Sequence, residues 1–121
     1  MTGARRWVLL RHELPGGEWH YDWMIQRSDE AVAPLLTFRV FVRPDDAAVR
    51  EFAAERLGDH RAVYLEYEGE VSGGRGRVDR LAAGVVESLR ESAERVDVRL
   101  AGVGEWRGVR VDGASWEFRR G

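Results

Sequence analysis

Short strand-like runs separated by glycine-rich turns recur along the whole chain of 121 residues and limit the folds it can adopt. The turn signals are Pro-Gly-Gly at 15–17, Gly-Gly at 73–74, the glycines at 102 and 104, and Asp-Gly at 112–113. The pattern predicts strands over residues 6–11, 19–27, 35–42, 60–68, 75–80, 96–100, 106–111 and 115–119. Many short strands joined by such turns favour a meander that closes into a small barrel or a sandwich.

Two segments of the chain carry a helical signal. Residues 45–58 place an apolar stripe at helical spacing, with Asp45 or Asp46 able to cap its start and Gly58 its end. The stripe consists of Val49, Phe52, Ala53 and Leu57. Residues 85–95 fit either a second helix or a strand that leads into an acidic loop. We therefore expect a mainly β (α+β) fold: a small closed or partly open antiparallel β-barrel with one or two short helices.

Composition narrows the classes of function. A chain with 44% hydrophobic and 33% charged residues is typical of a globular protein, and we expect a single domain over residues 1–121. No apolar run approaches the ~18 residues of a membrane span and no signal peptide is recognisable, so we expect a cytoplasmic protein without membrane contact. Cysteine is absent, which leaves histidine, carboxylates and backbone oxygen as ligands for any metal.

The charge balance does not by itself indicate a nucleic-acid partner. The net charge is −2, and basic and acidic residues are nearly equal in number. All 19 basic residues are arginines. We interpret this as codon usage in a GC-rich genome, although arginine also suits bidentate contacts with phosphate.

The stretch RHELPGGEWHYDW at 11–23 holds two of the three histidines of the chain. Side chains alternate between the two faces of a strand, so His20, Asp22 and Met24 share one face, and the Cα atoms of the first two lie about 7 Å apart. His12 ends the preceding strand, and a hairpin at Pro-Gly-Gly returns it to His20. The alternatives are a His-His-Asp metal site and a set of solvated turn residues.

The third histidine begins the stretch HRAVYLEYEG at 60–69. If these residues form a strand, His60 and Tyr64 point to the same face. All three histidines then converge on one polar pocket, provided that this strand lies across the barrel from residues 19–27.

These motifs resemble the 3′-phosphoesterase domain of bacterial DNA ligase D and its stand-alone relatives. That family has a His, a short turn, His-x-Asp-x-Arg, then Asp-His-x-x-x-Tyr, an aromatic-Glu-Gly, a glycine-rich loop and an Asp-Arg pair. The matching residues are His12, His20, Tyr21, Asp22, Asp59, His60, Tyr64, Tyr67, Glu68, Gly69, the loop SGGRG at 72–76, Asp79 and Arg80. With VDVRLAG at 96–102 and WEFRR at 116–120, the resemblance spans nearly the whole chain.

The resemblance implies a compact barrel with a crescent-shaped open site. It implies that His12, His20 and Asp22 hold a divalent metal, with Mn²⁺ preferred and Zn²⁺ or Co²⁺ as alternatives. It also implies that His60 and Tyr64 contact the scissile phosphate. Because a histidine suits proton donation to the leaving oxygen, we assign His60 as general acid, with Tyr64 orienting the phosphate. The reaction that it implies is the removal of a 3′-phosphate or a 3′-terminal ribonucleotide, which leaves 3′-OH. The substrates are then the 3′ ends of DNA or of a primer-template, and the context is DNA repair. A DNA ligase or end-joining proteins are the partners it suggests.

The chain departs from the family pattern in two places. The turn between the first two histidines is longer, and Met24 stands where the family has an arginine that clamps phosphate. A thioether cannot replace a bidentate donor. Arg39, Arg43, Arg75 and Arg77 are candidates to substitute, and we place Arg75 and Arg77, by the glycine-rich loop, first.

Two other functions stay open, the first of them because of the missing arginine. One is a catalytically weak or inactive relative that binds metal and DNA ends or a repair partner. The other is a non-haem Fe(II) oxygenase, in which His20, Asp22 and His60 form the 2-His-1-carboxylate set.

Overall fold

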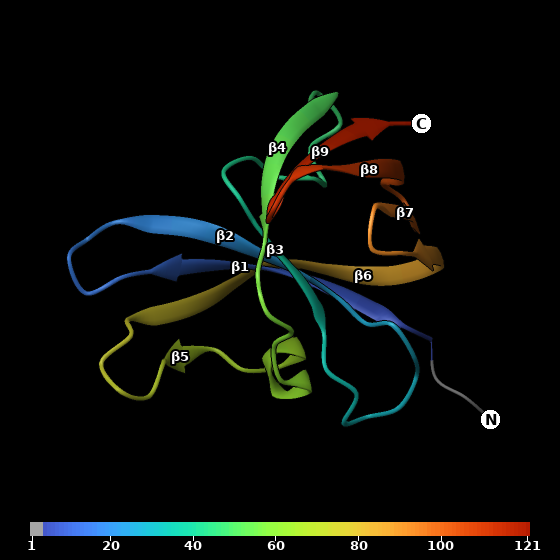
Figure 1. The fold of residues 1–121 in the computed structure, drawn as a ribbon. Coiled ribbons are helices and arrows are strands. Elements are labelled where there is room, and N and C mark those ends of the chain that lie inside the picture. Colours follow the sequence, from blue (N-terminus) through green and yellow to red (C-terminus); the bar gives the residue numbers. More distant parts are fainter. Residues whose placement is uncertain (1–3) are drawn as a thin grey trace.

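The computed structural model describes residues 4–121, which form one antiparallel sheet of nine strands (Figure 1). Its elements are β1 (Arg6–Glu13), β2 (Trp19–Ile25), β3 (Leu36–Val40), β4 (Glu51–Arg56), η1 (Ala62–Leu65), β5 (Gly69–Glu70), β6 (Arg77–Glu91), β7 (Arg95–Leu100), β8 (Gly104–Asp112) and β9 (Ser115–Arg120). Eight strands close a ring in the order β1-β2-β3-β4-β9-β8-β7-β6, because β6 pairs back with β1. The expected antiparallel barrel is confirmed.

An aromatic core fills the inside of this ring. Its large buried side chains are Trp7, Trp23, Phe38, Phe52, Trp106, Trp116 and Phe118. Phe118 lies near the centre, with ring centroids 5.2 Å from Phe52 and 5.3 Å from Trp23. Because β2 sends Trp23 and Ile25 into this core, its alternate residues must point outward. The core therefore holds β2 rigidly and fixes which of its side chains face away from the barrel.

A second, smaller apolar cluster covers the outside of β1, β2 and β6. Its buried members are Val8, Leu10, Met24, Leu35, Leu65, Val71 and Val78, with Tyr64 packed against them. Several of these residues come from the segment that links β4 to β6, which we call the outer segment (residues 57–76). Figure 1 shows its two elements, η1 and β5, together on one side of β1, β2 and β6. The candidate site lies between this segment and the barrel wall.

The helix predicted over residues 45–58 is wrong. The segment holds turns followed by β4, whose burial alternates, with Phe52 and Ala54 inward. Its apolar residues fit the period of a helix as well as that of a strand. The strand forms because the segment pairs with β9, where Phe52 lies opposite Phe118. Asp46 accepts a hydrogen bond from the amide of Ala48 at 2.9 Å, which closes a turn where a helix cap was expected.

The secondary structure of two further segments, residues 60–68 and 85–95, also bears on the predictions. The strand predicted over residues 60–68 is wrong: His60 makes one isolated bridge with Leu35, and η1, the only helical element in residues 4–121, follows. For the ambiguous residues 85–95, the alternative of a strand leading into a loop is confirmed, because β6 runs to Glu91 and residues 92–94 turn into β7. No helix in the described part of the chain is long and apolar enough to cross a membrane.

Candidate metal centre

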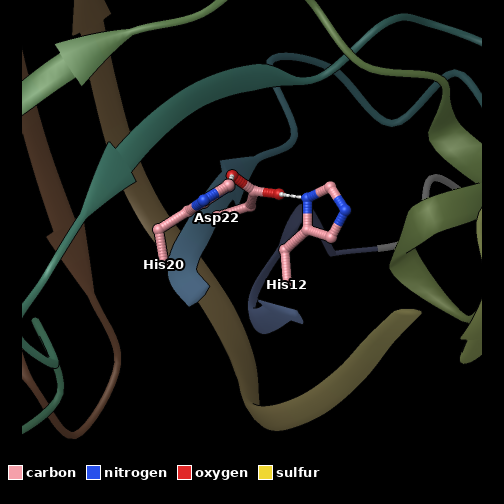
Figure 2. Close-up of side chains that lie close together, drawn as sticks. All are labelled: His12, His20 and Asp22. Carbon is pink, nitrogen blue, oxygen red and sulfur yellow. Dashed lines mark ion pairs between the residues drawn. The ribbon is translucent and has the colours of Figure 1, made fainter. Parts of the chain in front are cut away.

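The hairpin of β1 and β2 brings His12, His20 and Asp22 together on the outer face of the barrel. The register sets His12 opposite His20 and Leu10 opposite Asp22. The Asp22 carboxylate lies between the two imidazoles, with Oδ2 3.4 Å from His12 Nδ1 and Oδ1 3.0 Å from His20 Nε2 (Figure 2). One ligand atom from each residue lies within 4.8 Å of the other two. The triad can therefore bind a single metal ion.

The proton on His12 is placed by the glycine-rich loop. Nε2 of His12 lies 2.7 Å from the backbone carbonyl oxygen of Arg75. A carbonyl oxygen only accepts hydrogen bonds, so Nε2 carries the proton and donates it. In the neutral ring, Nδ1 then presents its lone pair toward Asp22. This is the arrangement of a metal-binding histidine, in which the second nitrogen is held by an outer hydrogen bond.

The burial of Asp22 favours a cation at this place. Its side chain is 3% exposed, and that of His20 is 5% exposed. Although His20 Nε2 is close, Asp22 Oδ1 has no hydrogen-bond partner. A buried carboxylate oxygen without a donor is costly, and an ion shared with the two imidazoles would satisfy it. Two nitrogens and a carboxylate suit Mn²⁺, Zn²⁺, Co²⁺ or Fe²⁺, so these residues fit a divalent metal.

A pocket of about 480 Å³ opens beside the triad. Its lining residues are His12, Asp22, Met24, Asp59, His60, Arg61, Tyr64, Val71, Ser72, Arg75 and Val78. The structure thus brings His60 and Tyr64 into the same pocket as His12 and Asp22, two of the candidate metal ligands, and the rings of His60 and Tyr64 have centroids 5.9 Å apart. Nδ1 of His60 donates to the Gly58 carbonyl oxygen at 2.8 Å, which leaves Nε2 for proton exchange.

Two arginines in the pocket lack an acidic partner within residues 4–121. The guanidinium of Arg75 donates to the carbonyl oxygen of Ser72 at 2.7 Å and to its hydroxyl at 3.2 Å. Arg61 lies over the Tyr64 ring, 5.9 Å from its centroid. The nearby Asp59 is already bound by Arg27, at 2.8 and 2.9 Å. The pocket therefore carries positive charge available to an anion.

The other three arginines predicted as candidates to bind phosphate, Arg39, Arg43 and Arg77, do not line this pocket. Arg39 pairs with Glu55 at 3.3 Å. Arg77 pairs with Asp79 at 3.1 Å and lines a neighbouring pocket, while Arg43 pairs with Asp45 at 2.8 Å. In each case the hydrogen bond to the aspartate raises the pKa of the guanidinium. The structure brings together the predicted triad, His60, Tyr64 and Arg75, and it adds Arg61, which sequence reasoning missed.

Gly76 locks the glycine-rich loop against β1. Its φ is +95°, and a Cβ there would overlap the backbone carbonyl of Glu13. Only glycine fits such a position. The neighbouring carbonyl of Arg75 is thereby held on His12. The SGGRG motif therefore holds the imidazole of His12 through its backbone, a role that its composition does not reveal.

No protein-family model matches this chain, and no curated protein matches it in sequence.

Proposed function

We propose that this protein is a metal-dependent phosphoesterase that processes DNA 3′ ends. It removes a 3′-phosphate or a 3′-terminal ribonucleotide and leaves 3′-OH. The main support is the pocket, which is lined by two members of a triad able to hold a divalent ion, by the His60 and Tyr64 pair and by two arginines without acidic partners in the described residues. The motif resemblance to the 3′-phosphoesterase domain of DNA ligase D supports the choice of substrate.

The residues around the triad supply the remaining chemistry. When bound, a divalent ion would act as a Lewis acid that neutralises phosphoryl oxygen. Hydrolysis of a 3′-phosphate breaks the bond from phosphorus to O3′ while water adds to phosphorus. With Nδ1 held on the Gly58 carbonyl, a protonated His60 donates its Nε2 proton to the departing O3′, and the proton that water loses as it bonds to phosphorus restores His60. Tyr64 donates a hydrogen bond to a phosphate oxygen. Arg61 and Arg75 balance the phosphate charge.

The second candidate is a relative that binds metal and DNA ends without turnover. Met24 favours it, because this residue is 1% exposed and packs in the outer apolar cluster where the family has a phosphate-binding arginine. The oxygenase hypothesis has less support. The group of potential ligands contains His12 in place of His60, and an oxygenase would leave His60, Tyr64 and the two arginines without a role.

Cleavage of a primer that carries a 3′-phosphate or a 3′-ribonucleotide tests the proposal. We expect turnover with Mn²⁺, none with chelator, and loss of turnover in His60→Ala. The control is Arg99→Ala, which changes an exposed arginine on β7 and should leave turnover intact. A parent protein that binds Mn²⁺ and the primer but releases no product would contradict the proposed reaction and favour the second candidate.

A further inference from the structure

Position 24 lacks the arginine of the family pattern, but the neighbouring strand β3 carries Arg39. We propose that Arg39 on β3 contacts the substrate phosphate next to the metal. This inference rests on the proposed function, because it assigns the phosphate-binding residue of the same site.

The register places Arg39 beside a metal ligand. Asp22 lies directly opposite Arg39 on β3, and Met24 lies opposite Thr37. Residues opposite each other on antiparallel strands share a face, with Cβ atoms about 4.5–5.5 Å apart, and diagonal neighbours are within reach of long side chains. Arg39 is therefore the direct neighbour of Asp22 and the diagonal neighbour of Met24. Its guanidinium can reach the place that an arginine at position 24 would serve.

The present contacts of Arg39 are weak. It lies between two carboxylates, Asp22 on β2 and Glu55 on β4. Its Nη1 lies 3.3 Å from Glu55 Oε1, in a pair whose side chains are 40% and 50% exposed. Its Nε is buried and has no hydrogen-bond partner. An exposed pair of this kind contributes little, so the guanidinium can turn from Glu55 toward a phosphate and use its unpaired Nε at small cost.

The alternative arginines are less suited to this role. Arg43 and Arg77 are each held by an aspartate two residues along the chain. Arg61 and Arg75 belong to the outer segment and line the pocket from there. Arg39 is carried by a strand of the barrel, where the aromatic core fixes its backbone. A phosphate bound to the ion would then be held from both sides.

The experiment compares Arg39→Ala and Arg39→Lys with the control Arg99→Ala, which also removes an exposed arginine with one glutamate partner, at 3.4 Å. Calorimetry gives the affinity for Mn²⁺, and then the affinity of the Mn²⁺-loaded protein for inorganic phosphate. We expect Arg39→Ala to keep its Mn²⁺ affinity and to lose roughly ten- to a hundredfold in phosphate affinity and in kcat/KM, the worth of a charge-assisted hydrogen bond. Arg39→Lys should recover part of the loss, because it restores the charge but not the fork.

A second variant approaches the same point without removing Arg39. Glu55→Gln takes away the competing carboxylate and should raise phosphate affinity by roughly two- to fivefold, the worth of an exposed pair. The inference is overturned if Arg39→Ala has the same phosphate affinity as Arg99→Ala. It is also overturned if Arg39→Ala loses as much affinity for Mn²⁺ as it loses for phosphate. If the parent shows no turnover but Arg39→Ala still loses phosphate affinity, the anion site stands and the proposed reaction fails. If the parent turns over robustly and Arg39→Ala leaves this turnover unchanged, the proposed reaction stands and the inference about Arg39 fails.

Discussion

Replacing Asp22 by its isosteric amide should separate metal binding from folding. Asp22→Asn keeps the shape of the side chain but removes the only carboxylate of the triad. In the metal-free protein we expect little loss of stability, because Asp22 Oδ1 has no hydrogen-bond partner to lose and the new amide group can donate to an imidazole. With metal present, the variant should lack the stabilisation that the parent gains.

The size of this difference follows from linkage. A ligand present at 100 times its dissociation constant stabilises the folded state by about 2.7 kcal/mol. If the amide weakens binding by about a hundredfold, the same concentration stabilises the variant by only ~0.4 kcal/mol. For a chain of this length each kcal/mol moves the melting temperature by roughly 3–5 °C. The parent should therefore gain about 8–13 °C, and Asp22→Asn only about 1–2 °C.

Differential scanning calorimetry with MnCl₂ and with chelator measures both values. The matched control is Asp97→Asn, the same chemical change on β7, where Asp97 pairs with Arg95 at 3.5 Å. This control should keep the full shift with Mn²⁺. If Asp22→Asn keeps it as well, the ion binds elsewhere and the assignment of the triad is refuted.

Three further predictions concern His60, the glycine-rich loop and the ion pair of Glu91 with Arg27. His60→Ala should lower turnover by roughly 10²–10⁴-fold, the contribution of a general acid, while keeping the calorimetric shift with Mn²⁺; loss of that shift would show that His60 is a ligand. Gly76→Ala should weaken Mn²⁺ affinity, because the loop can no longer hold the Arg75 carbonyl on His12. The control Gly74→Ala, also at positive φ but with open space around it, should keep the Mn²⁺ affinity of the parent. Equal Mn²⁺ affinities of the two variants would exclude a role of the loop in metal binding. Hydrogen bonds from Arg27 lower the pKa of Glu91, so its contribution is fully present above the ordinary glutamate pKa of ~4.3 and is lost as pH falls through the lowered value. Urea unfolding should show Glu91→Gln to be less stable than the parent at about pH 7, by roughly 1 kcal/mol once solvent screening is discounted, and this difference should shrink as the pH falls below ~4.3. A difference that stays the same in acid would contradict this.

The parts of the site that local rules govern could be predicted from the sequence. Alternation along a strand and one tight turn are enough to bring His12, His20 and Asp22 together, because both strands belong to one hairpin. The sequence also predicts that His60 lies near Tyr64, by alternation along a strand. The two residues do lie close together, but the 3₁₀ turn η1 between them is the cause.

The remaining features depend on contacts between distant segments. Residues 51–56 form a strand because β9, near the end of the chain, pairs with them, and nothing within the segment selects strand over helix. The position of Arg39 beside Asp22 depends on the register between β2 and β3. The place of Arg61 depends on how the outer segment crosses the barrel. Sequence reasoning named Arg39 only as one of four candidates and missed Arg61, because no local signal selects either arginine.

The direct test of the metal centre is a crystal grown with Mn²⁺ and examined by anomalous scattering at the manganese edge. We predict one strong peak bound by His12 Nδ1, His20 Nε2 and the Asp22 carboxylate, at the wall of the pocket that His60 and Tyr64 line. A map with no peak at these three atoms, and with manganese bound instead to other carboxylates of the surface, would contradict it.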